Sequence, residues 1–422
     1  MPASSSLPIP SLLLWLDLRS SPQPLQTVHM KILSIKIGNN FLFPDGFFID
    51  FKNSDRVRKG SERHDNYKSA HKLKTGVYNQ VLLSLVGLNA TGKTTVLQII
   101  SFVANLAILQ RSLESATYIL NKLHVSKAKP LNIQVELLEN NKVFYLDSLI
   151  VENKGMFVFA DETLYEMPLS QYKSNCEKEN FKVLKKRSDE INNIYLKSDE
   201  SIIKSILLKK GVFIFNRDLV NLNYPKWLGD PPVEIIKLFD PSIKKLVIES
   251  SDDCSISSAK ASIRFERSSE SNENSVMSLE NVVSSGTITG LTIFPWLVAA
   301  LSAGGYVVID GIENHLNKKL ITFIFDLFTD EKTNPKGACL IFSTHYPELL
   351  DYMTRKDNIY ISLRDSDECL RVQRLSDSDK VTRNDILKSK ILLLNIINGT
   401  APKYSILKNA KDKVIDLLSS GE

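Results

Sequence analysis

The segment Gly87–Thr95 contains residues whose types and spacing suit the binding of phosphate groups. It reads G-x-x-x-x-G-K-T, the pattern of a phosphate-binding loop. The two glycines let the backbone wrap closely and point its N–H groups at phosphate oxygens. Lys93 reaches the β- and γ-phosphates, and the Thr94 hydroxyl can hold Mg²⁺. The residues predicted to contact a nucleotide are Gly87, Asn89, Ala90, Thr91, Gly92, Lys93, Thr94 and Thr95.

The elements on either side of this loop agree with the motif. Residues 80–86 form an apolar, β-prone run, which predicts a buried strand, and residues 94–104 have helical periodicity. Strand, loop and helix in this order are the context that the motif requires. The phosphates would then lie at the N-terminus of a helix.

Three later segments could complete a nucleotide site. The apolar run Gly305–Asp310 ends in a carboxylate that could coordinate Mg²⁺. The run Cys339–His345 ends in a histidine that could sense a γ-phosphate, although an isolated histidine is more often structural. Ser284, Ser285 and Gly286 precede a predicted helix over 291–301, either as an anion cradle or as an ordinary helix cap.

Taken in this order, the four segments resemble the ATP-binding-cassette ATPase superfamily, over most of the chain from Met30. The resemblance is greatest to the overcoming-lysogenization-defect and abortive-infection group, including ATPases of PARIS-type anti-phage systems. That group carries a Ser-Ser-Gly-Thr signature, an "Asp-Glu-x-Glu-Asn" stretch and a Thr-His switch. The resemblance implies an α/β P-loop NTPase of the ABC head type. Its mixed central sheet would be flanked by helices, an antiparallel β subdomain and a helical lobe.

The resemblance also implies roles for individual residues. Lys93, Asp310, Glu313 and His345 would be catalytic, and Thr94 and Asp310 would hold Mg²⁺ beside ATP. Two copies would pair head to tail, as a homodimer or within a higher oligomer. Each ATP would then lie between the phosphate loop of one copy and Ser284–Gly286 of the other. Asn314–Asn317 resembles the short loop that contacts the second copy.

One position departs from the family pattern. Gly311 follows Asp310, where the family has the glutamate that polarises the attacking water. Glu313 lies two residues further on, and the alternation of side chains along a strand would place it differently. We therefore expect ATP hydrolysis to be slow, with Glu313 as the candidate for positioning water.

The composition is that of a globular protein, and changes along the chain predict its division into domains. The 422 residues contain 43% apolar and 24% charged side chains, as in soluble globular proteins. The predicted divisions are a disordered leader (1–29), a lobe with the phosphate loop and a β meander at 131–166 (30–170), an inserted helical region (171–275), a second lobe (276–375) and a helical tail (376–422). A polar, basic stretch at 53–76 and a turn or loop at 268–274 are expected to be irregular.

Charge, cysteine content and hydropathy exclude some classes. The net charge of +5 neither requires nor excludes nucleic acid. Four cysteines without C-x-x-C spacing argue against a zinc ribbon or a disulfide scaffold and fit the cytoplasm. No uninterrupted apolar run reaches about 18 residues, so no membrane span is expected.

Two functions remain open at this point. The first is an ATP-gated sensor or scaffold in phage defence, triggered by a phage protein and controlling a separate nuclease. A separate chain is expected because residues after 375 contain no cluster of carboxylates that would form a nuclease site. The second is a DNA repair or recombination ATPase that binds DNA through the basic residues of 53–76 and 171–210. A transport ATPase is disfavoured, since the signature lacks Gly-Gly-Gln.

Overall fold

The computed structural model describes residues 30–54, 69–190, 196–206, 213–216, 230–249, 260–268, 270–314, 316–365, 367–380, 387–402 and 404–419. The predicted leader 1–29, most of the basic stretch 53–76 and His315 of the predicted dimer-contact loop lie outside these ranges.

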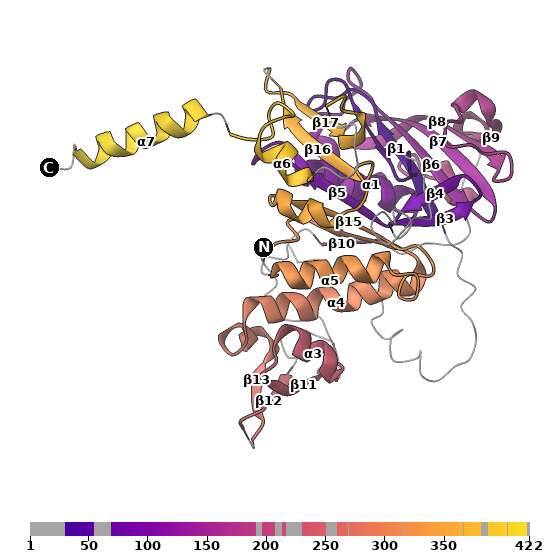
Figure 1. Cartoon of the computed structure of the whole chain (residues 1–422). Coiled ribbons are helices and arrows are strands. Elements are labelled where there is room, and N and C mark those ends of the chain that lie inside the picture. The colour runs from indigo at the N-terminus through magenta and orange to yellow at the C-terminus, as the bar shows by residue number, and fades with distance from the viewer. Residues whose placement is uncertain are drawn as a thin grey trace, which may run out of the picture.

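The central element is a six-stranded, mostly parallel sheet (Figure 1). Its order is β10 (Phe213–Asn216), β14 (Tyr306–Ile309), β15 (Cys339–Thr344), β5 (Leu82–Val86), β16 (Ile359–Arg364) and β17 (Leu370–Arg374). The first five strands run parallel, and β17 pairs with β16 in the antiparallel sense. Strands β14, β15 and β5 are apolar and buried along their whole length, as expected of a parallel sheet covered on both faces.

A second, antiparallel sheet contains the predicted meander. Its order is β2 (Phe47–Asp50), β1 (Lys31–Ile37), β6 (Leu131–Glu139), β7 (Lys142–Asn153), β8 (Met156–Pro168) and β9 (Lys182–Lys186). Two-residue turns join β6 to β7 and β7 to β8. Asn140 and Asn141 in the first turn, and Lys154 and Gly155 in the second, all have positive φ. This is the type I′ geometry that matches the twist of paired strands.

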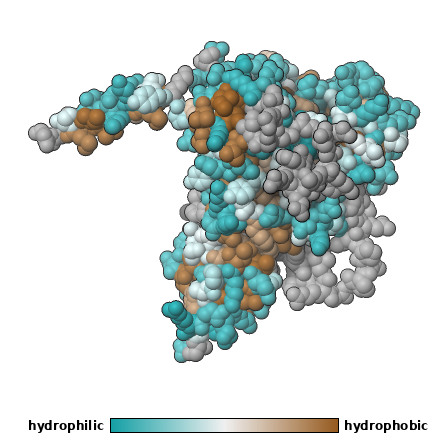
Figure 2. All heavy atoms as spheres, viewed as in Figure 1, coloured by the Kyte–Doolittle hydropathy of each residue, from teal (hydrophilic) through white to brown (hydrophobic). Residues whose placement is uncertain are grey.

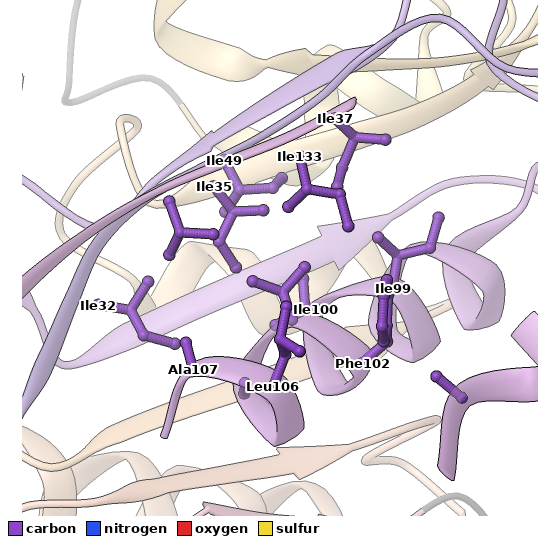
Figure 3. Packing of buried hydrophobic residues seen from close by; sticks show 14 of the residues in the cluster. Ile32, Ile35, Ile37, Ile49, Ile99, Ile100, Phe102, Leu106, Ala107 and Ile133 are labelled. Carbon is purple, nitrogen blue, oxygen red and sulfur yellow. The ribbon is translucent and has the colours of Figure 1, made fainter. Parts of the chain in front are cut away.

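The helix that follows the phosphate loop, α1 (Lys93–Ala107), lies between the two sheets. Its side chains are buried on nearly every side, which explains why it is apolar around most of its circumference. Figure 3 shows Ile99 and Ile100 of α1 packing against Ile35 of β1 and Ile133 of β6. Burying each such side chain stabilises the fold by roughly 1.5–3 kcal/mol. These apolar contacts therefore hold α1 in place between the two sheets.

The other face of the parallel sheet is covered by α4 (Ser285–Ala303) and α5 (Lys318–Thr329), which lie side by side in Figure 1. By length and composition α4 could cross a membrane, contrary to the expectation from apolar runs alone, but 61% of its apolar window is buried inside the fold. Leu297 and Leu301 of α4 share a core with Phe325 of α5, so α4 serves as a core helix here.

A small lobe precedes α4. It consists of α3 (Val233–Phe239) and a three-stranded sheet of β11 (Ile243–Glu249), β12 (Lys260–Phe265) and β13 (Asn272–Ser275). Its core includes Leu291 of α4, and Phe239 of α3 lies so close to Gly290 that a Cβ there would come within 2.2 Å of the ring. The lobe is therefore anchored to the first half of α4.

Three local predictions were wrong. The described part of 171–210 is not helical beyond short 3-10 turns such as η4 (Lys178–Asn180) and η6 (Ile202–Ser205), and its residues 182–186 form β9 at the edge of the antiparallel sheet. Residues 70–76 of the stretch expected to be irregular belong to the hairpin formed by β3 (Ala70–Lys74) and β4 (Val77–Gln80). The expected loop at 268–274 leads directly into β13, which pairs with β12.

Three more helices lie outside the two sheets. They are α2 (Thr117–Lys122), α6 (Lys388–Leu393) and α7 (Tyr404–Ser419). The last two agree with the helical character predicted for the tail. The helix α6 packs on the 3-10 helix η10 (Pro347–Tyr352), whereas α7 projects away from the body (Figure 1).

Candidate nucleotide-binding site

The predicted site residues follow three neighbouring strands of the parallel sheet. The phosphate loop follows β5, Asp310 follows β14, and His345 follows β15, which lies between the other two. Parallel strands end at the same edge of a sheet, and ligands of such sheets bind beyond the carboxyl ends of the strands. The fold therefore brings together side chains that are more than 200 positions apart in the sequence.

Both glycines of the loop lie so close to neighbouring backbone or side-chain atoms that a residue with a Cβ would collide with them. A Cβ at Gly87 would come within 2.3 Å of the Ser362 carbonyl oxygen on β16. Gly92 has φ +90°, and a Cβ there would lie 2.6 Å from a methyl group of Leu370. Gly92 is the N-cap of α1 and has no side chain to cap its N–H groups. The first turn of the helix is therefore available to an anion.

Lys93 reaches back across the mouth of the loop. Its Nζ donates hydrogen bonds to the carbonyl oxygens of Gly87 at 2.9 Å and Leu88 at 2.8 Å. The side chain is buried, and burial lowers the pKa of Lys93 to about 8, against the opposing effect of Asp310 and Glu313. Its charge is therefore only partly compensated within the protein, which favours a multiply charged anion beside it.

His345 lies directly beside this ammonium group. The distance from His345 Nδ1 to Lys93 Nζ is 3.3 Å. An ammonium group has only protons to give, so Nδ1 accepts, and the proton of the neutral imidazole is on Nε2. Burial and the charge of Lys93 both lower the pKa of His345, which keeps the ring neutral at neutral pH. The Nε2–H group is thus the one that could donate to a phosphate oxygen.

Asp310 connects the phosphate loop to the adjacent strand. Its Oδ2 accepts a hydrogen bond from the Thr94 hydroxyl at 2.6 Å, and its Oδ1 accepts one from the hydroxyl of Ser343 on β15. Within the described ranges no group of three or more His, Cys, Asp or Glu residues could hold a metal ion by itself. One carboxylate and one hydroxyl suit Mg²⁺, which is commonly bound by few protein ligands together with substrate phosphates.

The turn after Asp310 explains the departure at Gly311. Gly311 has φ +65°, and a Cβ there would lie 2.5 Å from the side-chain nitrogen of Asn314. Strand β14 ends at Ile309, so the alternation expected along a strand does not apply to Glu313. Instead, Glu313 Oε1 accepts a hydrogen bond from the His345 backbone N–H at 2.8 Å. Its buried Oε2 has no hydrogen-bond partner in the described part of the chain.

Ser284, Ser285 and Gly286 lie at the start of α4. Ser284 is the N-cap, and its Oγ accepts a hydrogen bond from the Thr287 backbone N–H at 3.1 Å. Ser284 and Ser285 are exposed. This is the ordinary helix cap that the sequence also allowed.

Sequence reasoning missed the residues that brace the loop. The hydroxyl of Ser362 donates to the Thr91 carbonyl oxygen, and Arg364 Nη2 donates to the Ala90 carbonyl oxygen at 2.6 Å. On the other side, Lys122 Nζ donates to the Thr95 hydroxyl at 2.9 Å. None of these residues belongs to a sequence motif, because each acts only once β16 or α2 has packed against the loop.

An aromatic pair flanks the same end of the loop. The Phe41 ring is 55% exposed and lies 4.1 Å, between centroids, from the His124 ring. The neighbour of Phe41, Leu42, accepts a hydrogen bond from the backbone of Leu370, whose side chain contacts Gly92. His124 follows Lys122 by two residues. These connections place an exposed aromatic surface close to the start of α1.

Comparison with known families adds one finding. A family model described as an AAA domain, and associated in that description with the AbiEii toxin and type IV toxin–antitoxin systems, matches residues 82–351. The match covers well over half of the chain. It begins with β5 and ends within η10, so it contains the phosphate loop, Asp310 and His345. A search of curated proteins found no match.

Proposed function

The chain belongs to this family of AAA domains and has the α/β fold of a P-loop NTPase, and from that premise we propose that it is an ABC-type ATPase that binds ATP with Mg²⁺ and hydrolyses it slowly. The observation that carries the proposal is the convergence of Lys93, the Thr94–Asp310 pair and His345 at one edge of the sheet. Each supplies a different interaction that a nucleoside triphosphate needs.

We propose a role in nucleotide binding or hydrolysis for each of these residues. The N–H groups of the loop and of the first turn of α1 bind the phosphates, and Lys93 exchanges its two carbonyl partners for β- and γ-phosphate oxygens. Thr94 and Asp310 would hold Mg²⁺, which neutralises charge on the phosphates when bound. His345 Nε2–H donates to a γ-phosphate oxygen and so distinguishes ATP from ADP.

Glu313 is the candidate for positioning the attacking water. One of its carboxylate oxygens is fixed by the His345 backbone, and the other is buried without a partner. A buried carboxylate oxygen with free lone pairs can accept a proton or hydrogen bond from water beside the γ-phosphate. Its position in a turn, rather than next to Asp310, supports slow turnover.

A second copy would complete the site. The exposed N-terminus of α4, with Ser284, Ser285 and Gly286, can present hydroxyl and N–H groups to the ATP of another chain. ATP would then join the two copies, as homodimer or as part of a larger oligomer, and hydrolysis would release them.

A switch of this kind suits a sensor in phage defence better than a motor. The family description's link to toxin–antitoxin systems supports the further proposal that a phage protein triggers the ATPase, which then releases a separate nuclease in the cytoplasm, as in PARIS-type systems. DNA binding is the second candidate. It is favoured by the exposed lysines Lys182 and Lys186 of β9, and it would give steeply salt-dependent affinity.

The test is ATP binding and ATP turnover by the full chain beside matched variants. Lys93→Ala should abolish both, whereas Lys332→Ala, an exposed lysine, should change neither. Glu313→Gln keeps the acceptor for the His345 N–H, so binding should survive while turnover falls about 100-fold or more. Glu331→Gln is its control. Unchanged binding by Lys93→Ala would contradict the proposed site.

A further inference from the structure

The C-terminal helix α7 presents an apolar face that is exposed along the whole helix among the described residues of the chain. It has sixteen residues, all of them exposed. The large apolar side chains and their exposed fractions are Tyr404 79%, Ile406 61%, Leu407 57%, Val414 54%, Ile415 53%, Leu417 62% and Leu418 73%. At 100° per residue these positions occupy about half of the circumference, and all the polar residues except Lys411 occupy the other half. Figure 2 shows this division along the projecting helix.

A helix of this kind requires a partner. A single helix of about this length is marginal in water, because most helical stability in proteins comes from packing an apolar face. The polar half of α7, which includes Ser405 and Asn409, already faces solvent, so the apolar half is the part that remains to be buried.

A second exposed apolar surface lies at α6. It consists of Leu387 (47% exposed), Leu393 (55%), Leu394 (70%) and Ile396 (38%), which we call the α6 patch. The opposite side of α6, with Ile391 and Leu392, is buried against the body. The patch is the brown area near the base of the projecting helix in Figure 2.

We infer that α7 of one copy packs on the α6 patch of a second copy, and that the exchange is reciprocal. The same chain carries both surfaces, so a two-fold axis satisfies both at once and closes the assembly. The seven apolar residues of α7 and the four of the patch place eleven large apolar side chains on each side, and the polar residues beside them would form the rim of the interface.

The position of the patch also favours a second copy as the occupant. Ser389 of α6 donates a backbone hydrogen bond at 3.0 Å, and a hydroxyl hydrogen bond, to the carboxylate of Asp351 in η10. The helix η10 begins two residues after His345. An α7 seated on the patch would therefore join two copies next to the nucleotide edge of the sheet. This contact needs no nucleotide, so it goes beyond the proposed ATP-dependent pairing.

The first experiment measures self-association of the full chain without nucleotide by sedimentation at several protein concentrations. Leu407→Glu combined with Val414→Glu places charge in the apolar face, and Leu394→Glu places it in the patch. Each should raise the dimer dissociation constant about 100-fold or more, as expected for central interface residues. Ser405→Glu combined with Asn409→Glu adds the same charge to the polar face and should change the dimer dissociation constant less than about threefold.

A second experiment identifies the occupant. Chains with Leu394→Cys are mixed with differently tagged chains carrying Val414→Cys, and a disulfide between the two tags is expected. The unsubstituted chain, whose Cys339 is buried and whose Cys176 and Cys369 are half-buried, is the control. A disulfide within single chains that carry both substitutions would overturn the inference in favour of a folded-back helix. A monomeric parent chain, or binding of α7 to lipid vesicles instead, would also overturn it.

The outcome is separable from that of the proposed function. Lys93→Ala should lose ATP binding but keep the nucleotide-independent dimer, because Lys93 contacts neither α6 nor α7. Loss of the dimer in the α7 variant with ATP binding intact would support the exchange alone.

Discussion

The hydroxyl of Thr94 and the carboxylate of Asp310 are hydrogen-bonded at 2.6 Å, although 216 positions separate them in the sequence. This bond joins the first turn of α1 to the end of β14, and the other oxygen of Asp310 is held by Ser343 on β15. The carboxylate is thereby oriented from both sides before any ligand binds.

Asp310→Asn should therefore weaken the binding of Mg²⁺ at the ATP site. The amide can still accept from Thr94 or Ser343 but lacks the negative charge that Mg²⁺ requires. We expect turnover to fall about 100-fold or more, and the Mg²⁺ concentration for half-maximal ATP binding to rise about tenfold. Titration with Mg²⁺ at fixed ATP measures this. Asp330→Asn, at the exposed end of α5, is the control, and an equal effect of the two substitutions would contradict the assignment.

The pKa of about 8 at Lys93 predicts that ATP binding takes up protons near this pH. Bound phosphates favour the charged amine and raise its pKa, so affinity should be constant below pH 7 and fall as the pH rises through 8. Calorimetry at pH 8.5 in buffers of different ionisation enthalpy measures the uptake directly. Binding enthalpies that are independent of the buffer would show that Lys93 does not change protonation.

His345 should determine discrimination between ATP and ADP rather than affinity for nucleotide in general. His345→Ala removes the N–H donor for the γ-phosphate, so ATP affinity should fall about tenfold while ADP affinity changes little. His345→Gln keeps an N–H donor and should recover part of the preference. Competition binding with both nucleotides is the measurement, and parallel losses for ATP and ADP would assign His345 a structural role.

Restoring glutamate at position 311 should not restore fast hydrolysis. Gly311 has φ +65°, where a residue with a Cβ costs roughly 1–2 kcal/mol, and its Cβ would also collide with Asn314. We expect Gly311→Glu to lower the melting temperature and not to raise turnover. Gly155→Glu is the matched control, because Gly155 has φ +81° and nothing within 4 Å of a Cβ. A larger loss at position 311 than at 155 would isolate the collision with Asn314.

The sequence predicted the residues of the nucleotide site better than it predicted the secondary structure around them. Gly87, Lys93 and Asp310 could be predicted because local strand and loop patterns reveal them. The position of Glu313 could not, because it depends on the left-handed turn at Gly311 and on a hydrogen bond to β15. Ser343 and Arg364 were missed for a similar reason, since they act through sheet pairings that no local pattern encodes.

The errors in secondary structure have a related cause. The lysine-rich segment around β9 has no strong apolar periodicity, so local propensity suggested a helix. Its strand exists because β8 offers an open edge, and lysines are common on such edges because they discourage further pairing.

The bracing of the phosphate loop by β16 and β17 also has a consequence for synthesis. Ser362, Arg364 and Leu370 are made about 270 residues after the loop that they support. At roughly 5–20 residues per second on the ribosome, the loop waits many seconds for its supports. A nascent or truncated chain that stops before β16 therefore lacks the contacts that shape the loop. Competence to bind nucleotide should appear late in translation, in one step, as the last parallel strand pairs with β5.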